Sequence, residues 1–452
     1  MAQVIKPTSR DQFHIAIICA LPLEANAVNL LFDEFWDDDG DPFGRANGDT
    51  NSYSTGRIGK HNVVLAILPG MGTNNAAAAT ASLRSSYSNL KLALLVGICG
   101  GVPRIEGDDV FLGDVVVSKA IVQYDFGRQY PGSFEIKNTI EDSLGRANKD
   151  IRGLLAVFET ERMREWLMTK SAGYLKQMQD AARRKRRRAK YQNPGVIQNK
   201  LFSPDYIHRH RLKPCDTCNA KNNAGEICND KNNAGEVCND KNHAGEICES
   251  ASKESCADVG CDDSELVKRE EFFVDDGGFN IFIGRIGSGN AVMKSGKDRD
   301  RIAKQHDLIA FEMEGAGAWD EVPCLVVKGV CDYADSHKNK QWQDFAAATG
   351  ACVMKAILDR YVVAEGGQGS ALPQTNGQKV QNNVRGVQNN TRDVQNTTRN
   401  VQNETRNVQN NTRNVSKNTF GNGVKIDQSD VIWNLPSYPE KRKDVEYPWR
   451  FR

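Results

Sequence analysis

Three acidic stretches of the chain each follow directly on an apolar run. Glu24 lies in ALPLEANAV, Glu312 and Glu314 lie in AFEMEGAG, and Asp332 and Asp335 lie in GVCDYADSHKNK. Acids at the carboxyl ends of strands meet in the crevice where open α/β sheets bind their ligands. Each acid alone is more often a helix cap or a solvated surface group. Their joint placement favours a site in which carboxyl groups transfer protons.

A cluster of glycines marks a fourth position of interest. The segment GICGG at residues 97–101 follows directly on the apolar run at residues 92–96. Because glycine lets the backbone approach a neighbouring group closely, the sequence predicts that Gly97 and Gly100 bring backbone against a bound molecule.

Short apolar, β-branched runs alternate with helix-like stretches around these positions. Such alternation predicts an α/β fold with a mixed or mostly parallel sheet covered on both faces. The expected strands are residues 14–20, 62–68, 92–98, 113–118, 280–286, 308–313 and 324–330. The expected helical stretches are residues 22–35, 72–88, 147–191, 297–306, 315–320 and 341–361, of which 147–191 holds one or two helices.

Seven segments form an ordered set, namely IAIICALPLE, GMGTNNAAAA, LLVGICGG, GDVVVSK, SGNAVM, FEMEGAG and CDYAD. Together they resemble the purine nucleoside phosphorylase and methylthioadenosine nucleosidase superfamily over residues 13–135 and 278–362. The resemblance implies a three-layer α/β/α fold with a central mixed sheet. More narrowly, YDFGRQYPG at 124–132 and CDYADSHKNKQWQDFAAATG at 331–350 resemble the phosphorylase-like domains of fungal intracellular immune receptors.

The resemblance implies roles for three acids. Glu24 is expected to orient an attacking water, Glu314 to hold the ribose hydroxyls, and Asp332 to protonate the purine at N7. Cleavage of an N-glycosidic bond passes through an oxocarbenium-like state, so the base must leave neutral and a nucleophile must wait on the other face. One carboxyl group at the base and another at the water meet both needs, and burial of Asp332 would favour its protonated form.

The same resemblance implies how the substrate is held. Met313 is expected to pack under the sugar, and the backbone of Val292 and Met293 to meet the edge of the base. Members that cleave 6-oxopurines usually carry asparagine at the position of Asp332, so adenine is the expected leaving base.

Water is the favoured nucleophile. Phosphorylases of the superfamily place arginines at the end of the GICGG strand and in the first strand–helix loop, and a serine after the first glycine. Here these places hold Leu95, the acidic loop LPLE and Ile98. Because phosphate needs charge-assisted donors to leave water, we expect a nucleosidase. A phosphate-dependent phosphorylase and a non-catalytic nucleoside-binding module are the alternatives.

The substituent at the 5′ position follows from the narrower resemblance. Immune effectors of that kind destroy cellular ATP, which implies hydrolysis of ATP to adenine and ribose triphosphate in an immune or cell-death effector. Arg128, Lys119 and Lys338 are the candidate partners of the phosphates, although each alone is more often a surface charge.

The pattern of apolar runs is interrupted between residues 138 and 275, which predicts an insertion between two parts of the catalytic domain, 1–137 and 276–365. The insertion contains a basic run at 183–188, which we interpret as a solvated helix end in preference to a nuclear import signal or anion patch.

Three tandem decapeptides, KNNAGEICND, KNNAGEVCND and KNHAGEICES, occupy residues 221–250 of the insertion. Their single cysteines, ten residues apart, do not supply the paired ligands of a zinc site, although Cys215 and Cys218 form one CxxC. A flexible insert is therefore favoured over structural zinc, and neither metal nor cofactor is expected.

Two further segments follow the catalytic domain. Residues 366–415 carry an Asn-rich heptad repeat that is typical of a flexible linker. Residues 416–452 contain NTFGNGVKIDQSDVIWN, which loosely resembles the amyloid-type motifs through which fungal receptors recruit effectors. A receptor partner is the interaction that this second segment implies.

The composition limits the remaining partners. The chain has 452 residues, 39% of them hydrophobic, and a net charge of +1, which gives no bias toward nucleic acid or membranes. The apolar segment at 13–23 is too short to span a bilayer, and no secretory signal precedes it, so we expect a cytoplasmic protein. The superfamily resemblance further implies a homo-oligomer that binds an adenine nucleotide or nucleoside.

Overall fold

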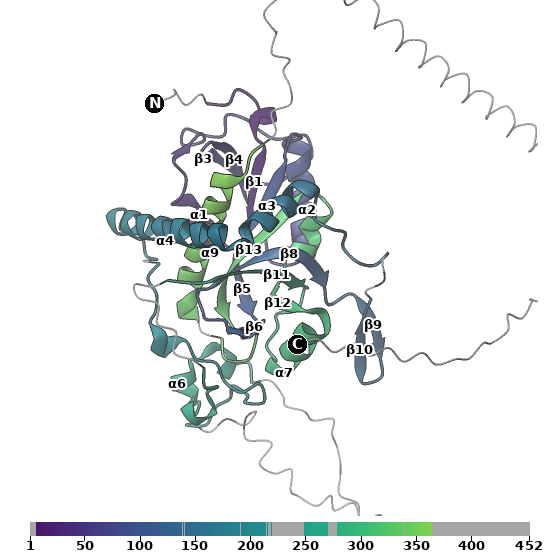
Figure 1. Ribbon diagram of the computed structural model, residues 1–452, viewed down its shortest axis with the longest axis vertical. Helices are drawn as coiled ribbons and strands as arrows, with labels where there is room; N and C mark the ends of the chain where they lie inside the picture. The colour runs from purple at the N-terminus through teal and green to yellow at the C-terminus, as the bar shows by residue number, and fades with distance from the viewer. Residues whose placement is uncertain are drawn as a thin grey trace, which may run out of the picture. The chain divides into compact units, whose positions relative to one another are not determined.

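A nine-stranded mixed sheet runs through the centre of the chain (Figure 1). The computed structural model describes residues 6–363 except 138, 140, 190, 214, 216–217, 219–247, 270–277 and 339. All of these residues belong to one compact unit, Met1–Glu365. The decapeptide repeats up to residue 247, the expected linker and the expected C-terminal signalling motif lie outside the described residues.

The strands follow the order β12-β11-β8-β13-β5-β1-β4-β3-β2 across the sheet. Their bounds are β1 Ile15–Cys19, β2 Glu34–Phe35, β3 Tyr53–Ile58, β4 His61–Ile67, β5 Leu92–Gly101, β8 Val115–Gln123, β11 Ile281–Ser288, β12 Leu308–Glu312 and β13 Cys324–Asp332. Two small hairpins stand apart from the sheet, β6 Arg104–Ile105 with β7 Asp108–Asp109, and β9 Gly127–Tyr130 with β10 Ser133–Ile136.

One half of the sheet closes on itself. β12 pairs in parallel with β11 and also antiparallel with the end of β5, where Phe311 lies opposite Gly100. The five strands from β12 to β5 therefore form a small closed barrel, and the carboxyl ends of β5, β12 and β13 meet at one rim.

The helices occupy the segments between the strands (Figure 1). They are α1 Pro22–Asn29, α2 Thr73–Ser86, α3 Lys149–Phe158, α4 Glu161–Arg184, α6 Cys256–Val259, α7 Gly296–His306, α8 Gly315–Trp319 and α9 Gln343–Arg360. Short 3₁₀ turns lie at Arg10–Gln12, Val196–Gln198, Ala251–Lys253, Asp263–Glu265 and Lys340–Trp342.

Helices cover the sheet from two sides. Successive residues of a strand point to opposite faces. On β13, Gly329 faces Ala346 of α9, whereas the Lys328 side chain reaches Glu314 at the start of α8. The structure thus confirms the predicted α/β class with a central mixed sheet.

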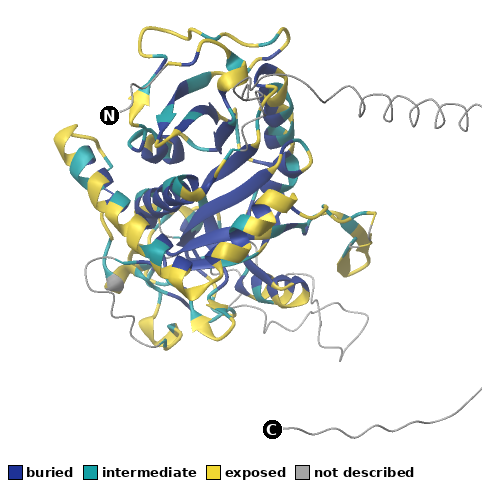
Figure 2. Cartoon of the chain, turned by 45° about the horizontal axis from the view of Figure 1, so that its top comes forward, coloured by how far each residue is buried: buried dark blue, intermediate teal, exposed yellow. Residues whose placement is uncertain are grey.

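The strands are buried on both faces, as Figure 2 shows by their dark blue colour. All five residues of β1 and all nine of β13 are buried. Such continuous burial explains why these strands appear in the sequence as unbroken apolar runs. No helix among the described residues is long and apolar enough to cross a membrane.

Most of the predicted elements are present, although several differ in extent and some elements were not predicted. β8 continues to Gln123, beyond the expected 113–118. β5 continues through the glycines to Gly101 and does not end at residue 98. The helix expected at 22–35 ends at Asn29, and the short strand β2 follows it. The strand β3 was not predicted, because its sequence YSTGRI carries polar residues and a glycine in the peripheral part of the sheet.

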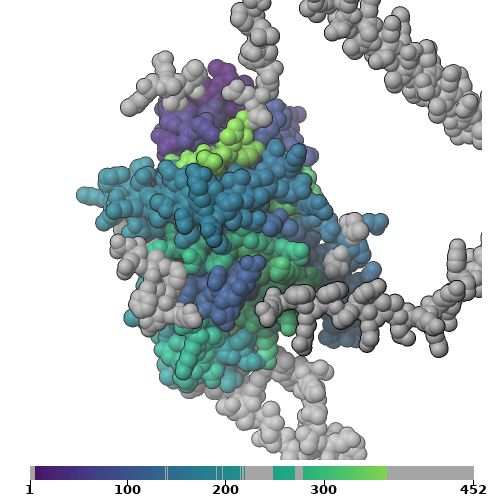
Figure 3. Space-filling model, viewed as in Figure 1, coloured from purple at the N-terminus to yellow at the C-terminus, as the bar shows by residue number. Residues whose placement is uncertain are grey.

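The first part of the predicted insertion packs on the helix and sheet of this unit. α4 lies across the surface in Figure 3 and contacts α9 beneath it. Met163, Leu167, Leu175 and Met178 of α4 are buried in the same hydrophobic core as the sheet. Residues 149–184 are therefore an integral layer of this unit.

Close packing of β13 against α9 depends on Gly329. A Cβ at this position would collide with the carbonyl group of Ala346. We expect Gly329→Ala to destabilise the fold by about 3 kcal/mol, because overpacking against backbone forces the helix away from the sheet. Denaturant unfolding measures this, with Gly153→Ala on the exposed side of α3 as the control, where added bulk meets no atom within 4 Å. Equal stability of both variants would contradict the packing described here.

Candidate active site

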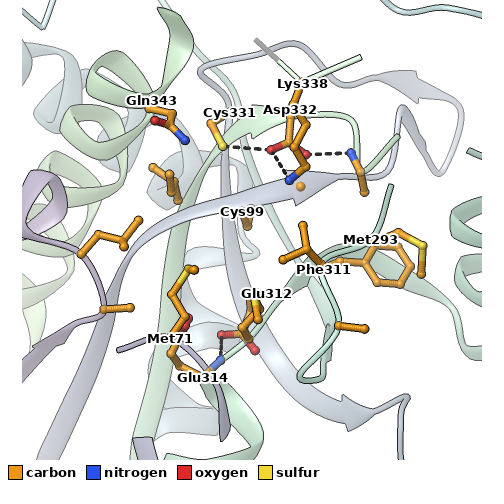
Figure 4. A pocket seen from close by; sticks show the side chains of 18 of the residues that line it. Met71, Cys99, Met293, Phe311, Glu312, Glu314, Cys331, Asp332, Lys338 and Gln343 are labelled. Carbon is orange, nitrogen blue, oxygen red and sulfur yellow. Dashed lines mark hydrogen bonds and ion pairs between the residues drawn. The ribbon is translucent and has the colours of Figure 1, made fainter. Parts of the chain in front are cut away.

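A cavity of about 230 Å³ opens at the rim where β5, β12 and β13 end. Figure 4 shows Asp332 and Lys338 on one side of it, Glu312 and Glu314 on the opposite side, and Phe311 and Met293 along a third wall. Its lining residues are Ala20, Leu21, Glu24, Met71, Ile98, Cys99, Gly100, Tyr124, Ala291, Val292, Met293, Phe311, Glu312, Met313, Glu314, Cys331, Asp332, Ala334, Lys338 and Gln343.

Glu24 is fixed at the start of α1. Its Oε2 accepts hydrogen bonds from the backbone N–H groups of Ala20 and Leu21, at 2.8 and 2.9 Å. Its Oε1 accepts one from the N–H of Ile98 on β5, at 2.9 Å. Three backbone donors thus hold a carboxylate that is only 2% exposed.

The glycines of β5 make room for two acids. A Cβ on Gly97 would occupy the position of the Glu24 carboxylate. A Cβ on Gly100 would lie 2.9 Å from Oδ1 of Asp332. Because the two glycines are three residues apart on one strand, about 10 Å of strand separates the positions where the acids pack. This is the physical reason for GICGG, and it brings Glu24 and Asp332 to one cavity.

Asp332 ends β13 and is paired with a lysine. Its Oδ1 accepts a hydrogen bond from Ala334 N at 2.9 Å, and its Oδ2 lies 3.0 Å from Nζ of Lys338. The two side chains form an ion pair at one end of the cavity.

A buried lysine neutralises part of an acidic cluster behind the cavity. Nζ of Lys328 lies 3.1 Å from Oε2 of Glu314, and the Lys328 side chain is almost fully buried. Oε1 of Glu314 accepts a hydrogen bond from Gly72 N at 3.4 Å. The carboxylate of Glu312 accepts hydrogen bonds from the N–H groups of Glu314 and Gly315.

Burial and the neighbouring charges shift the pKa values of Glu24, Glu312 and Lys328. Burial raises the pKa of Glu24 above its usual value near 4.5, although Lys328 opposes the shift. Burial and the nearby Glu314 raise the pKa of Glu312. Burial opposes the charge on Lys328, but the carboxylates of Glu314, Glu24 and Glu312 outweigh it and raise the lysine pKa. One permanent cation thus lies among three buried carboxyl groups.

The remaining walls of the cavity are apolar. Tyr124 packs edge-to-face on Phe311, with ring centroids 5.4 Å apart, and its hydroxyl donates to Ala291 O. Met293 packs on the cluster that contains these two rings. Val292 is 44% exposed at the mouth. Such a slot between apolar side chains suits a flat aromatic base.

The structure brings together most of the residues named from the sequence. Gly97 lies beneath Glu24, and the other members that line the cavity are Glu24, Gly100, Val292, Met293, Met313, Glu314, Asp332 and Lys338. Arg128 is exposed on the β9–β10 hairpin and does not line this cavity. Lys119 is exposed and pairs with Glu159 at 2.6 Å.

Sequence reasoning missed Lys328 and the two aromatic walls. The signal for Lys328 was a lysine inside the apolar run CLVVKGV, where an unpaired charge would be costly. Tyr124 and Phe311 gave no distinctive signal, because aromatic residues at strand ends are common in cores.

Two clusters of histidine and cysteine could hold a metal ion. One consists of His210, Cys215, Cys218 and Cys248, and the other includes His208, Cys261 and His337. The expectation of no metal rested on the single cysteines of the repeats. The ligand atoms instead come mainly from outside the repeats, so that reasoning does not apply to them.

Replacement of Lys328 by an uncharged residue should leave the repulsion between the buried carboxylates without compensation. We expect Lys328→Met to lower the free energy of unfolding by about 3–5 kcal/mol near neutral pH. The loss should shrink toward acid pH, because Glu24 and Glu312, whose pKa values are already raised, then take up protons and lose their charge. Denaturant unfolding at about pH 5 and about pH 8 measures it. A deficit that is independent of pH would contradict this electrostatic account.

Known proteins share this arrangement of segments. Residues 14–161 match the family described as the Phosphorylase superfamily. A protein of Hyaloscypha variabilis named "Nucleotide-binding leucine-rich repeat (NLR)-like protein" is 30% identical over 354 residues, covering 77% of this chain and 29% of that protein. The chain therefore spans less than a third of the length of that relative.

Solved structures of nucleosidases are also similar. The 5′-methylthioadenosine/S-adenosyl homocysteine nucleosidase of Helicobacter pylori is 14% identical, with 77% of this chain and 99% of that chain covered and a TM-score of 0.42. The futalosine hydrolase of Helicobacter pylori is 15% identical, with the same coverage and a TM-score of 0.42. This chain thus carries, over residues 14–161, a match to the Phosphorylase superfamily.

Proposed function

We propose that the chain is an N-ribosyl hydrolase that releases adenine from an adenine nucleotide or nucleoside. The observation that carries this proposal is the placement of two buried carboxyl groups, Glu24 and Asp332, against glycines of one strand and along one apolar cavity. Two acids at separate positions can serve the two ends of the scissile bond.

Glu24 is the proposed base. Its three backbone hydrogen bonds fix the carboxylate and leave lone pairs for a water molecule on the cavity side. The raised pKa of Glu24 makes it a stronger proton acceptor than an ordinary glutamate. It can therefore take the proton of the water that attacks the anomeric carbon.

Asp332 is the proposed acid at the base. A proton passed from its carboxyl group to N7 lets adenine leave as a neutral molecule. The carboxylate that remains is stabilised by Lys338 at 3.0 Å.

Glu314 is the proposed acceptor for the ribose hydroxyls. It is buried and forms an ion pair with Lys328 at 3.1 Å. The carboxyl groups around it also favour the positive charge that develops on the sugar in an oxocarbenium-like state.

Water is favoured as nucleophile because a phosphate ion finds few partners. Among the described residues that line the cavity, Lys338 is the only cation, and it is paired with Asp332. A phosphate dianion would need more charge-assisted donors than this to leave water.

ATP is the proposed substrate within this class, acting in an immune effector. Its support is the resemblance to fungal receptor domains and the NLR-like name of the relative. Since Arg128 and Lys119 do not line the described cavity, the partners of the phosphates would come from elsewhere, such as a second subunit of a homo-oligomer.

Release of adenine from a panel of substrates tests the proposal. We expect adenine from ATP without added phosphate, and slower release from ADP, AMP, adenosine and methylthioadenosine. Chromatography of free adenine measures it. Release that requires phosphate would indicate a phosphorylase, and tight binding without any release would indicate a binding module. A preference for adenosine would keep the hydrolase and refute ATP.

Replacement of either acid should abolish turnover with little effect on the fold. We expect Glu24→Gln and Asp332→Asn to lower kcat by roughly 10²–10⁴-fold, whereas the exposed controls Glu135→Gln and Asp320→Asn keep it. The activity of the unsubstituted chain should rise with pH as Glu24 ionises. Because the pKa of Glu24 is raised, this rise should occur at a higher pH than the ionisation of an ordinary glutamate. Undiminished activity of both variants would rule out the proposed roles.

A further inference from the structure

We propose that residues 206–213, 215, 218 and 248–261 are held together by two zinc ions, and that the second ion fastens the loop that follows Asp332 and carries Lys338. This inference does not depend on the proposed reaction, since it concerns what holds the loop in place. It starts from the two clusters of histidine and cysteine side chains.

The first cluster has the geometry of a tetrahedral zinc site. Cys218 and Cys248 each place Sγ 3.5 Å from Nδ1 of His210, and the Sγ atoms of Cys215 and Cys248 lie 3.6 Å apart. Zn–S bonds of 2.3 Å and Zn–N bonds of 2.0–2.1 Å at tetrahedral angles give edges of about 3.6 Å for S–N and about 3.8 Å for S–S. A disulfide would need an S–S distance of about 2.05 Å.

The second cluster groups His208, Cys261 and His337, and Cys256 lies beside it. Nδ1 of His208 lies 3.4 Å from Sγ of Cys261 and 3.8 Å from Sγ of Cys256. His337 completes the set, because its ligand nitrogen lies within 4.8 Å of the ligand atoms of His208 and Cys261. Nε2 of His337 is buried and has no hydrogen-bond partner among the described residues. A buried ring nitrogen without a partner is explained if it binds a metal ion.

The local structure positions these ligands. α6 begins at Cys256 and ends at Gly260, which is in the left-handed conformation, with φ of 79°. This turn returns Cys261 to Cys256, as the hydrogen bond from Cys261 N to Cys256 O at 2.8 Å shows.

Outer contacts orient both histidines for metal binding. Nε2 of His208 lies 2.9 Å from Ala251 O, and Nε2 of His210 lies 3.1 Å from Oε1 of Glu254. Lys213 holds the Glu254 carboxylate in turn, at 2.7 Å. Each Nδ1 atom is therefore turned toward its cysteines. Second partners of this kind are typical of zinc-binding histidines.

Zinc is the metal that these ligands favour. Three thiolates with one imidazole, and two thiolates with two imidazoles, are sets found in closed structural zinc sites. These residues also need such support, because few of their side chains are buried, namely Ala251, Val259 and the two histidines. Small segments with little core are commonly held by a metal ion.

The second site joins these residues to the candidate active site. His337 lies between Asp332, which ends β13, and Lys338, which pairs with it. Its ring stacks on Phe202 with centroids 4.2 Å apart, and the neighbouring Ser336 accepts a hydrogen bond from His208 N. Ala334 in the same loop has a positive φ of 52°, a strained conformation for a residue with a side chain. A metal ion on His337 would fix this loop from outside the cavity.

Metal content of the full chain tests the proposal without reference to activity. We expect two zinc ions per chain after purification, by elemental mass spectrometry. Replacement of zinc by Co²⁺ should give the visible absorption of tetrahedral cobalt and thiolate-to-cobalt charge transfer. Absence of bound zinc together with absence of this spectrum would overturn the proposal.

Variants separate the two sites. Cys215→Ser with Cys218→Ser should lose one zinc ion, and Cys256→Ser with Cys261→Ser should lose the other, whereas Cys352→Ala in the core should keep both. His210→Cys, which retains a ligand, should also keep both. Retention of two ions by either double variant would show that those cysteines are not ligands.

Hydrogen exchange tests the link to the loop. Loss of the second site should speed exchange of the peptide containing residues 331–338 by at least about tenfold, while loss of the first site should not. Unchanged exchange in the variant that lacks the second ion would overturn the fastening role. If that variant does not fold, chelator titration of the unsubstituted chain, followed by cobalt absorption and by exchange of the same peptide, gives the same decision.

Discussion

The candidate site depends on how closely strand β5 approaches two carboxyl groups. Glu24 and Asp332 are far apart in the sequence, and each occupies space that a side chain on β5 would otherwise fill, at Gly97 and at Gly100. A strand without side chains at these points can pass beside both acids and still pair with β1 and β13. The same strand supplies an N–H group to Glu24 from Ile98.

Burial of several carboxyl groups close together is electrostatically unfavourable, and one buried lysine offsets their negative charge. Lys328 lies on the central strand β13, on the face opposite α9, and pairs with Glu314. Without it, the buried carboxyl groups of Glu24, Glu312 and Glu314 would have no lysine among them. The fold therefore places a cation in its core, where an apolar side chain would normally lie. As a result, the site contains ionisable groups whose pKa values differ from those in water.

The insertion is packed closely on the part of the chain that carries the candidate site. α4 contributes to the hydrophobic core, and the segment with His208 contacts the loop after β13 through Ser336 and His337. Asp332 thus ends a strand of the sheet, and the loop that follows it and carries Lys338 contacts the insertion. The insertion therefore packs against the loop from which Lys338 reaches the cavity.

Sequence patterns were sufficient to locate most of the helices and strands and to name the kinds of residue at the ends of the strands. Apolar periodicity reports whether a residue is buried, so β1, β4, β5, β8, β11, β12 and β13 could be placed from it, and the glycines and acids at their ends could be named. Which of these side chains contact one another is visible only in the folded chain. Lys328 pairs with Glu314, Arg128 lies on an exposed hairpin, and His337 joins His208 and Cys261, because these contacts arise from how distant segments cross in space. The pattern of residues within one segment does not report which distant segment lies beside it. A charged residue within an apolar run therefore indicates that it has a partner, but not which residue that partner is.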